Sequence, residues 1–354
     1  MKKYLAILLA LCLLLGLCAC GQEPAPTEAP VETTEAPVET TEATEETTAP
    51  VEEPTEVPGA FSIAALKGPT AMGLVQLMNA AETEGTALND YTFTLAGAAD
   101  EVTPRFIKGE LDMICVPANL ASVLYNKTEG QVVVLAINTL GVLYIVENGE
   151  TVSSLEDLKG QTIVAAGKGS TPEYALRYLL TENGIDPDQD VTIDWKSEHA
   201  ECVAALAEGT ATIALLPQPF VTVAQTKIEG LRMALDLTEE WDKLDNGSGL
   251  LTGVIVTRKD VVEAQQEGID VFLQEYADSV EWVNANTEDA AALIGSYDIV
   301  AAPVAQKALP YCNIVCITGE EMQAKLSGYL QVLYDAAPES VGGKLPEADF
   351  YYGN

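Results

Sequence analysis

The stretch VAAGKGSTPEYAL, Val164–Leu176, decides the fold prediction. A short apolar run ends at a glycine and a lysine, and helix-like spacing begins after Ser170 and Thr171. The same order of apolar run, Lys-Gly, Thr and helix occurs earlier in AALKGPTAMG, Ala64–Gly73. A turn from a strand into a helix leaves backbone N–H groups free at the helix start. Each stretch therefore predicts a strand end that can hold a polar ligand.

Strand-like and helix-like segments alternate on both sides of these turns. The strand candidates are Phe61–Leu66, Tyr91–Leu95, Asp112–Val116, Gln131–Ile137, Thr162–Ala166, Val191–Trp195, Thr210–Leu216 and Gly253–Thr257. Strands separated by helices of this length predict mostly parallel sheets with right-handed crossovers. The segment 238–249, TEEWDKLDNGSG, is a predicted loop, and after Gly253–Thr257 we expect only helices.

The alternation restarts in mid-chain, which predicts an α/β fold with two lobes. Lobe one would comprise residues 59–143 and 250–354, and lobe two residues 144–249. The two hinge crossings would lie near Gly141–Val146 and Gly249–Val254. Because ligands bind at the carboxyl ends of strands in open α/β sheets, two facing lobes offer their strand-end loops to one shared cleft.

The two turns also have a purely structural interpretation. Ser170 and Glu173 have the spacing of a capping box, as do Thr318 and Glu321, and Thr70 can cap its own helix. Such caps use the N–H groups that a ligand would need. The matched position of both turns, one in each predicted lobe, favours the ligand-binding interpretation.

The first residues predict an export signal. Lys2 and Lys3 precede an apolar run, Leu5–Leu17, that is too short to span a bilayer. The run ends in Leu-Cys-Ala-Cys-Gly, which resembles a bacterial lipobox and implies cleavage before Cys20 and diacylation of its thiol. We expect a lipoprotein signal peptide over residues 1–19, with a plain signal peptide as the alternative.

A tether follows, over residues 20–58. The sequence TEAPVET occurs twice in succession, at residues 27–40, and Glu23–Pro58 contains no basic residue, no aromatic residue, no Leu and no Ile. Such a segment cannot bury enough apolar surface to fold, and its prolines and like charges extend it. We expect it to hold a globular domain outside the cytoplasmic membrane.

Composition excludes several classes of function. After the tether 43 acidic residues face 16 basic ones, so binding to nucleic acid or to anionic lipid is not expected. The single histidine, His199, is interpreted as part of a helix start, and one histidine cannot form a zinc cluster. No phosphate-binding loop, dinucleotide fingerprint or hydrolase motif is found. We predict no catalytic residue, no metal and no cofactor.

The second turn and the strand end LLPQPF, residues 215–220, resemble the extracytoplasmic solute-binding proteins of ABC importers. The nearest group is the nitrate-, sulfonate- and taurine-binding and thiamine-precursor-binding set. The resemblance implies the type II periplasmic binding fold and an ABC permease and ATPase as partners. It also implies a small-molecule solute, organic or anionic, that is captured in the cleft between the lobes. We expect a monomer that is lipid-anchored on the extracytoplasmic face of the membrane.

The resemblance also places candidate ligand residues on the strand-end loops. Together with Asn138, the candidates are Lys67, Gly68, Pro69, Thr70, Met72, Pro117, Asn119, Lys168, Gly169, Ser170, Thr171, Tyr174, Gln218 and Phe220. None of these positions is an arginine, which a tight sulfonate or phosphate site would prefer, so an uncharged ligand stacked on Tyr174 or Phe220 stays open. Tyr174 is alternatively a packing residue. The alternative functions are an enzyme on the same fold, similar to a chorismate dehydratase, and a surface sensor.

Overall fold

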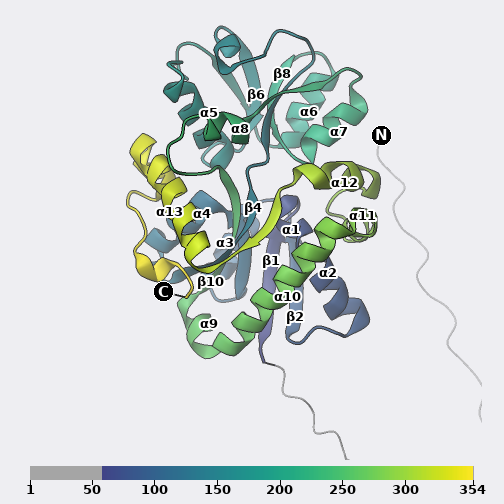
Figure 1. Ribbon diagram of the computed structural model, residues 1–354, viewed down its shortest axis with the longest axis vertical. Helices are drawn as coiled ribbons and strands as arrows, with labels where there is room; N and C mark the ends of the chain where they lie inside the picture. The colour runs from purple at the N-terminus through teal and green to yellow at the C-terminus, as the bar shows by residue number, and fades with distance from the viewer. Residues whose placement is uncertain (1–57, 354) are drawn as a thin grey trace, which may run out of the picture. The chain divides into compact units, whose positions relative to one another are not determined.

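The computed structural model describes residues 58–353, which belong to one compact unit. It contains two β-sheets, each flanked by helices (Figure 1). The predicted α/β architecture is confirmed. The predicted signal peptide, Cys20 and the tether up to residue 57 lie outside the described residues.

The first sheet has six strands in the order β11-β4-β10-β3-β1-β2. Its strands are β1 (Ala60–Leu66), β2 (Asp90–Ala96), β3 (Met113–Pro117), β4 (Val132–Leu140), β10 (Leu251–Arg258) and β11 (Ile314–Ile317). β1 pairs in parallel with β2 and β3, whereas β10 is antiparallel to both β3 and β4. β1 to β4 therefore run in one direction, and their carboxyl ends share one edge.

The second sheet repeats this plan with five strands in the order β7-β6-β8-β5-β9. Its strands are β5 (Leu143–Glu147), β6 (Thr162–Ala166), β7 (Thr192–Lys196), β8 (Ile213–Pro217) and β9 (Arg232–Asp236). β6 is parallel to β7 and β8, and β5 is antiparallel to β8 and β9. As in the first sheet, one antiparallel strand lies between strands that run the other way.

The chain passes between the two sheets twice. It leaves the first sheet at the end of β4 and enters β5 after only Gly141 and Val142, and it returns into β10 through residues 243–250. Leu140 and Leu251, the two residues beside these connections, are paired in the β4–β10 ladder. We call the segment Leu143–Asp242 the second half and the rest of the described chain the first half. Leu143, where we expected lobe one to end, is the first residue of β5.

Helices cover both faces of each sheet. In the first half they are α1 (Pro69–Met72), α2 (Val75–Asn79), α3 (Ala99–Ile107), α4 (Ala118–Lys127), α9 (Lys259–Ala264), α10 (Gln266–Ala285), α11 (Thr287–Ser296), α12 (Ala302–Ala308) and α13 (Gly319–Ala336). In the second half they are α5 (Thr171–Glu182), α6 (His199–Ala207), α7 (Phe220–Lys227) and α8 (Leu237–Asp242). Shorter turns are the π-helix η1 (Ala80–Glu84) and the 3₁₀ turns η2 (Leu155–Leu158), η3 (Leu309–Tyr311), η4 (Pro338–Val341) and η5 (Ala348–Phe350).

One apolar core extends across both halves. It contains buried residues of α3, α4 and α13 on the first sheet and of α5 and α8 on the second. Aromatic rings make the contact between them: the ring centroid of Trp241 in α8 lies 5.7 Å from Tyr329 in α13 and 4.7 Å from Tyr178 in α5. α1, α2, α10 and α11 cover the other face of the first sheet, and α6 and α7 the other face of the second. α13 is thus packed on both halves.

Three details of the secondary structure differ from the sequence prediction. Ile314–Ile317 forms β11, a strand at the edge of the first sheet, where we expected only helices; four residues are too few for alternation to be visible. The predicted loop after Leu237 contains α8, because the Asp236 carboxylate caps it by accepting the Thr238 N–H at 2.8 Å. Thr318 does precede α13, but its side chain makes no capping hydrogen bond.

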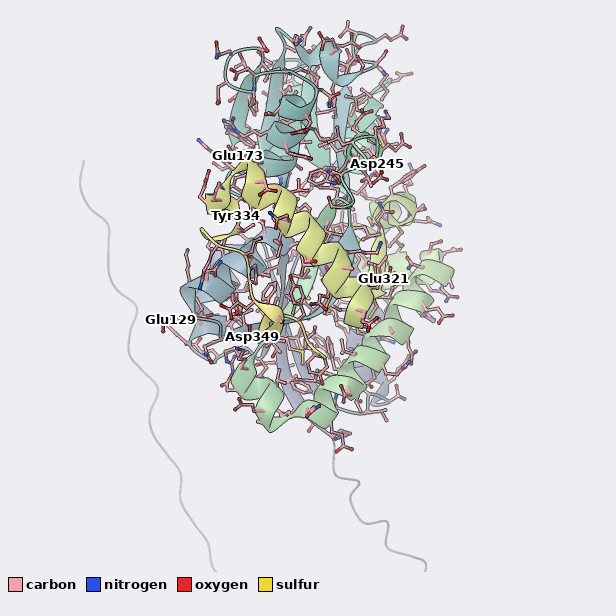
Figure 2. The ribbon with its side chains drawn as sticks, turned by 60° about the vertical axis from the view of Figure 1, so that its left-hand side comes forward. Glu129, Glu173, Asp245, Glu321, Tyr334 and Asp349 are labelled. Carbon is pink, nitrogen blue, oxygen red and sulfur yellow. The ribbon has the colours of Figure 1, made fainter. Side chains whose placement is uncertain are left out.

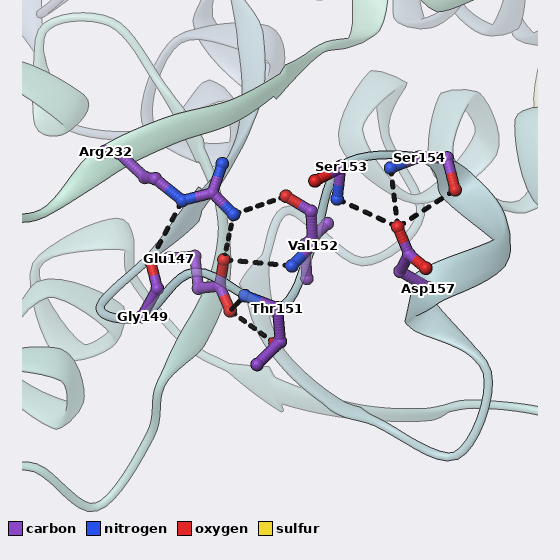
Figure 3. A network of polar contacts seen from close by, with 8 residues as sticks. All are labelled: Glu147, Gly149, Thr151, Val152, Ser153, Ser154, Asp157 and Arg232. Atoms are coloured by element: carbon purple, nitrogen blue, oxygen red, sulfur yellow. Dashed lines mark hydrogen bonds and ion pairs between the residues drawn. The ribbon is translucent and has the colours of Figure 1, made fainter.

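A buried carboxylate, that of Glu147, lies at the edge of the second sheet opposite the carboxyl ends of β6 and β8 (Figure 3). Glu147 is 2% exposed at the end of β5 and accepts hydrogen bonds from the N–H groups of Thr151, at 2.8 Å, and Val152, at 3.1 Å. Arg232 pairs with the same carboxylate and donates to the Gly149 carbonyl at 2.9 Å. Burial raises the pKa of Glu147, but these hydrogen bonds outweigh it and hold the pKa below its ordinary value.

Candidate functional site

The carboxyl ends of the strands that run in one direction bring most predicted ligand residues to two edges. These residues are Lys67–Thr70 after β1, Pro117–Asn119 at the end of β3, Asn138 in β4, Lys168–Thr171 after β6 and Gln218–Phe220 after β8. We call this set the facing edges, because residues from the two halves touch there. The Thr171 hydroxyl of the second half donates to the Asn119 amide oxygen of the first half at 3.4 Å.

The first turn is closed by its own hydrogen bonds. Gly68 has φ 143°, a conformation that residues with a Cβ rarely adopt, and its carbonyl accepts the N–H groups of Ala71 and Met72. The Thr70 hydroxyl donates to the Leu66 carbonyl at 2.9 Å and so does not cap α1. Lys67 pairs with Asp298 at 2.8 Å, which neutralises the one charge of this turn.

Uncharged polar groups lie directly behind the first turn. Asn138 is fully buried; its amide donates to the Thr70 carbonyl at 3.4 Å, and its oxygen accepts the Thr139 hydroxyl at 3.0 Å. Gly253 in β10 permits this packing, because a Cβ there would lie 2.4 Å from the Asn138 oxygen and 2.7 Å from a Thr70 methyl carbon. Comparing the sequences of the two turns does not identify Gly253 as part of this site. The only sequence signal is that a glycine occurs inside a predicted strand, which often marks a close approach of another group.

The second turn differs from the capping box that its sequence predicts. The Ser170 hydroxyl donates back to the Gly167 carbonyl at 2.8 Å and makes no cap hydrogen bond to α5. Glu173 reaches beyond Ser170, and its Oε2 accepts the Gly169 N–H at 2.6 Å. The other oxygen, Oε1, lies 3.3 Å from Arg177 Nε. A carboxylate of the chain therefore occupies the start of this turn.

The contact between the facing edges continues into the core. The Tyr329 hydroxyl of α13 lies 3.5 Å from the Thr171 hydroxyl oxygen, and the Asn119 amide donates to the Ser340 carbonyl at 3.1 Å. Both Asn119 and Thr171 are at least 98% buried. Two residues that the sequence predicts from different lobes thus meet in one buried hydrogen-bonded chain.

An imidazole adds a polar group that the sequence interpretation set aside. His199 begins α6, and its ring centroid lies 5.2 Å from that of Phe220 at the start of α7. Its Nδ1 is buried and has no hydrogen-bond partner in the described residues. Burial lowers the pKa of His199 to about 4, so the ring is neutral at physiological pH. Gln218, two residues before Phe220 in the sequence, is buried and accepts a hydrogen bond from the Thr222 hydroxyl at 2.9 Å.

Two predicted ligand residues lie away from the facing edges. Met72 is fully buried in the core on the other side of the first sheet, because α1 turns its side chain inward, so we remove it from the set. Tyr174 lines a groove of about 1020 Å³ between α5 and α13. Glu173 also lines this groove. Figure 2 shows it close to Tyr334 in the C-terminal part of α13. The groove is lined also by Arg177, Tyr178, Asn246, Gln331, Asp335 and Glu339.

Apart from Lys67 and Lys168, the polar side chains of the facing edges are uncharged hydroxyl and amide groups, and no arginine is among them. The His199 imidazole lies next to them, against Phe220. Within residues 58–353 no group of three or more His, Cys, Asp or Glu side chains could hold a metal ion. In the same residues no helix has the length and apolarity of a membrane span.

Comparison with known proteins identifies the family. Residues 87–303 match the family model described as "ABC transporter, phosphonate, periplasmic substrate-binding protein". The match spans more than half of the chain. The chain belongs to this family. This binding protein is therefore the extracytoplasmic substrate-binding component of an ABC importer, whose partners are a permease and an ATPase.

Solved structures confirm the fold of the binding protein. An ABC transporter protein from Parabacteroides distasonis is 20% identical with a TM-score of 0.69, over 82% of this chain and 98% of that one. The aliphatic sulphonate binding protein SsuA from Escherichia coli is 17% identical with a TM-score of 0.67, over 83% and 92%. The nitrate-binding protein NrtA from Synechocystis is 14% identical with a TM-score of 0.52, over 68% and 66%. No curated protein sequence matches the chain.

Proposed function

We propose that this protein binds one small solute between the facing edges and releases it to the permease without changing it chemically. The observation that carries the proposal is the Thr171–Asn119 contact, which joins the strand-end turns of the two halves. Residues 59–143 and 250–354 would form lobe one and residues 144–249 lobe two. The connections at Gly141 and Val142 and at residues 243–250 would be the hinge about which the lobes open and close.

Within this proposal the facing edges supply the ligand contacts. Asn119, Asn138, Thr171 and Gln218 would exchange their present internal hydrogen bonds for contacts to the solute on opening and reclosing. His199 would add a neutral ring with an unpaired nitrogen, and Phe220 beside it a surface for stacking. The absence of arginine at these turns supports a solute that is not recognised as a strong anion.

Mass spectrometry and thermal unfolding of the purified full chain test this function. Protein would be denatured, and any released solute identified by mass. The folded chain would then be titrated with that solute and with a panel of nitrate, sulfonates, phosphonates, pyrimidines and vitamins. A ligand at a hundred times its Kd adds about 2.7 kcal/mol to the free energy of unfolding. His199→Phe should reduce this stabilisation, whereas Lys227→Ala, an exposed change at the C-terminal end of α7 in the same half, should leave it intact.

Chemical turnover of a bound solute would contradict the proposal and favour an enzyme. So would the absence of a released solute together with no stabilisation by any compound. A shift that His199→Phe leaves unchanged would place the solute elsewhere, for example in the groove between α5 and α13.

We further propose that the mature protein is a monomer anchored through Cys20. The Leu-Cys-Ala-Cys-Gly sequence before the acidic tether supports this proposal, and so does the extracytoplasmic family. The measurement is the mass of the N-terminal peptide of the membrane-extracted protein. A peptide that begins at an unmodified residue would show a plain signal peptide.

A further inference from the structure

The start of α5 is the place at the facing edges where an anion would be expected. The first N–H groups of a helix lack partners within the helix and carry partial positive charge, so they attract anions. The Gly169 N–H, just before this helix, already has an anionic partner: Glu173 Oε2 accepts it at 2.6 Å. Within the first turn of α5, Pro172 has no N–H, and the N–H groups of Glu173 and Tyr174 bond to the Ser170 carbonyl. Glu173 is 9% exposed, and its Oε1 is held by Arg177, whose other arm pairs with Asp188 at 2.7 Å.

We infer that Glu173 is a specificity-determining residue that closes the second turn to oxyanions, so that the bound solute presents an uncharged hydrogen-bonding group there. The inference rests on the proposed function, because it concerns the same site. It differs from what the name of the family suggests, since a phosphonate or sulfonate would bring a second negative charge beside the carboxylate.

The other charges at the facing edges point the same way. Lys67 of the first turn is paired with Asp298. The buried polar side chains of the facing edges are all uncharged: Thr70, Asn119, Asn138, Thr171 and Gln218. Lys168 is the one basic residue of these turns that makes no ion pair in the described residues. Its positive charge is offset by the negative charge of Glu173 in the same turn and by the general excess of acidic side chains. An oxyanion would therefore find no net positive site.

A cation is also disfavoured at this turn. Arg177 lies against the free side of the Glu173 carboxylate, but it is shared with Asp188, so these three side chains keep a net negative charge. A cationic solute would have to displace a guanidinium that is fixed by two carboxylates, Glu173 and Asp188. An uncharged solute needs no such displacement, since the hydroxyl and amide groups of Thr171 and Asn119 both donate and accept hydrogen bonds.

The test uses methylphosphonate and sulfate as probes on the full chain, titrated calorimetrically. Wild type should bind neither anion with a Kd below about 1 mM, because the Glu173 carboxylate repels a second negative charge. Glu173→Ala uncovers the Gly169 N–H and removes one negative charge, so methylphosphonate should bind at least about tenfold more tightly. Glu182→Ala is the matched control, because it removes the same charge from the exposed end of the same helix. It should leave the affinity as in wild type.

Glu173→Gln covers the case in which the alanine variant does not fold. The amide keeps the size of the side chain and can still accept the Gly169 N–H, so only the charge is lost, and a smaller gain in methylphosphonate affinity is expected. Micromolar binding of methylphosphonate or sulfate by wild type would overturn the inference. The same holds if neither Glu173 variant gains affinity, or if Glu182→Ala gains as much as they do.

The solute released from denatured wild-type protein separates this inference from the proposed function. An uncharged solute supports both. A phosphonate, sulfonate or other oxyanion overturns the inference and leaves the proposed function standing. A gain of methylphosphonate binding in Glu173→Ala, combined with no released solute and no ligand for wild type, supports the closed turn and contradicts the proposed function.

Discussion

The two halves of the molecule share a strand order and a turn sequence, but they bury different polar groups. Among the described residues, the buried polar side chains of the first half carry only hydroxyl or amide groups: Thr70, Asn89, Asn119, Ser122, Asn138, Thr139, Thr257, Ser279 and Ser340. The second half buries two carboxylates, Glu147 and Glu173, besides Thr171, Gln218 and Thr222. The same architecture is thus stabilised without buried charge in one half and with it in the other.

The buried carboxylates make the second half the part of the protein whose stability depends more on pH. A buried carboxylate that accepts backbone N–H groups stabilises the fold only while it is ionised. Glu147 is held in this way at the end of β5. His199, also in the second half, is kept neutral by burial. We therefore expect acid to destabilise the second half before the first, and three measurements test this difference.

The largest effect is expected from Arg232→Ala. It removes the cation that pairs with the buried Glu147 and should lower the free energy of unfolding by about 3 kcal/mol, because an unpaired buried charge remains. Lys259→Ala is the control in the first half, since it breaks a pair with Asp349 whose side chains are 28% and 51% exposed. That change should cost less than about 1 kcal/mol. Urea unfolding followed by circular dichroism measures both, and equal losses would remove the distinction between the halves.

A smaller effect is expected from Glu147→Gln, and it should depend on pH. The folded pKa of Glu147 is lowered, so its contribution is present above the ordinary carboxyl pKa of roughly 4.3 and is lost as pH falls through the folded pKa. At pH 7 the variant should be less stable by about 1.5 kcal/mol or more, the value of a hydrogen bond to a charged group. Urea midpoints measured between about pH 7 and about pH 3 test this. A gap between variant and wild type that stays constant over this range would contradict the assignment.

The smallest effect is a titration that leaves the fold in place. The chain has one histidine, so its imidazole NMR signals belong to His199 without assignment. Burial lowers its pKa from the ordinary 6.5 to about 4, so the ring should stay neutral well below pH 6.5. Because the folded pKa is depressed, His199 adds stability above the ordinary value that is lost as pH falls toward 4. The same ring in urea-unfolded protein is the control, and equal midpoints would show that the ring is solvated.

Much of the fold and part of the site follow from local sequence. Apolar runs that alternate with helical spacing identify most strands, and the two Lys-Gly turns lie at strand ends as expected. Thr171 and Asn119 were predicted from separate loops, and the structure brings them into contact. Such features are visible in sequence because they depend on residues that are neighbours along the chain.

Other features depend on partners that are distant in sequence. The four residues of β11 become a strand only because β4 offers a free edge. Asn138 and Gly253, which have 114 residues between them in the sequence, are matched because their two strands approach closely. Glu173 and Ser170 have the spacing of a capping box, yet the positive φ of Gly169 turns its N–H toward the carboxylate and Ser170 bonds elsewhere. Spacing predicts that two groups can meet, and tertiary structure decides whether they do.

The pairing of Leu140 with Leu251 has a mechanical consequence. The strands that lead to and from the second half, β4 and β10, are hydrogen-bonded neighbours up to this pair. Both connections to the second half, residues 141–142 and 243–250, therefore start side by side at one place in the first sheet. In the proposed opening and closing they would bend together, as one hinge. A force that pulls the halves apart along the strands has to shear a ladder in the middle of a sheet, the direction in which hydrogen bonds break together.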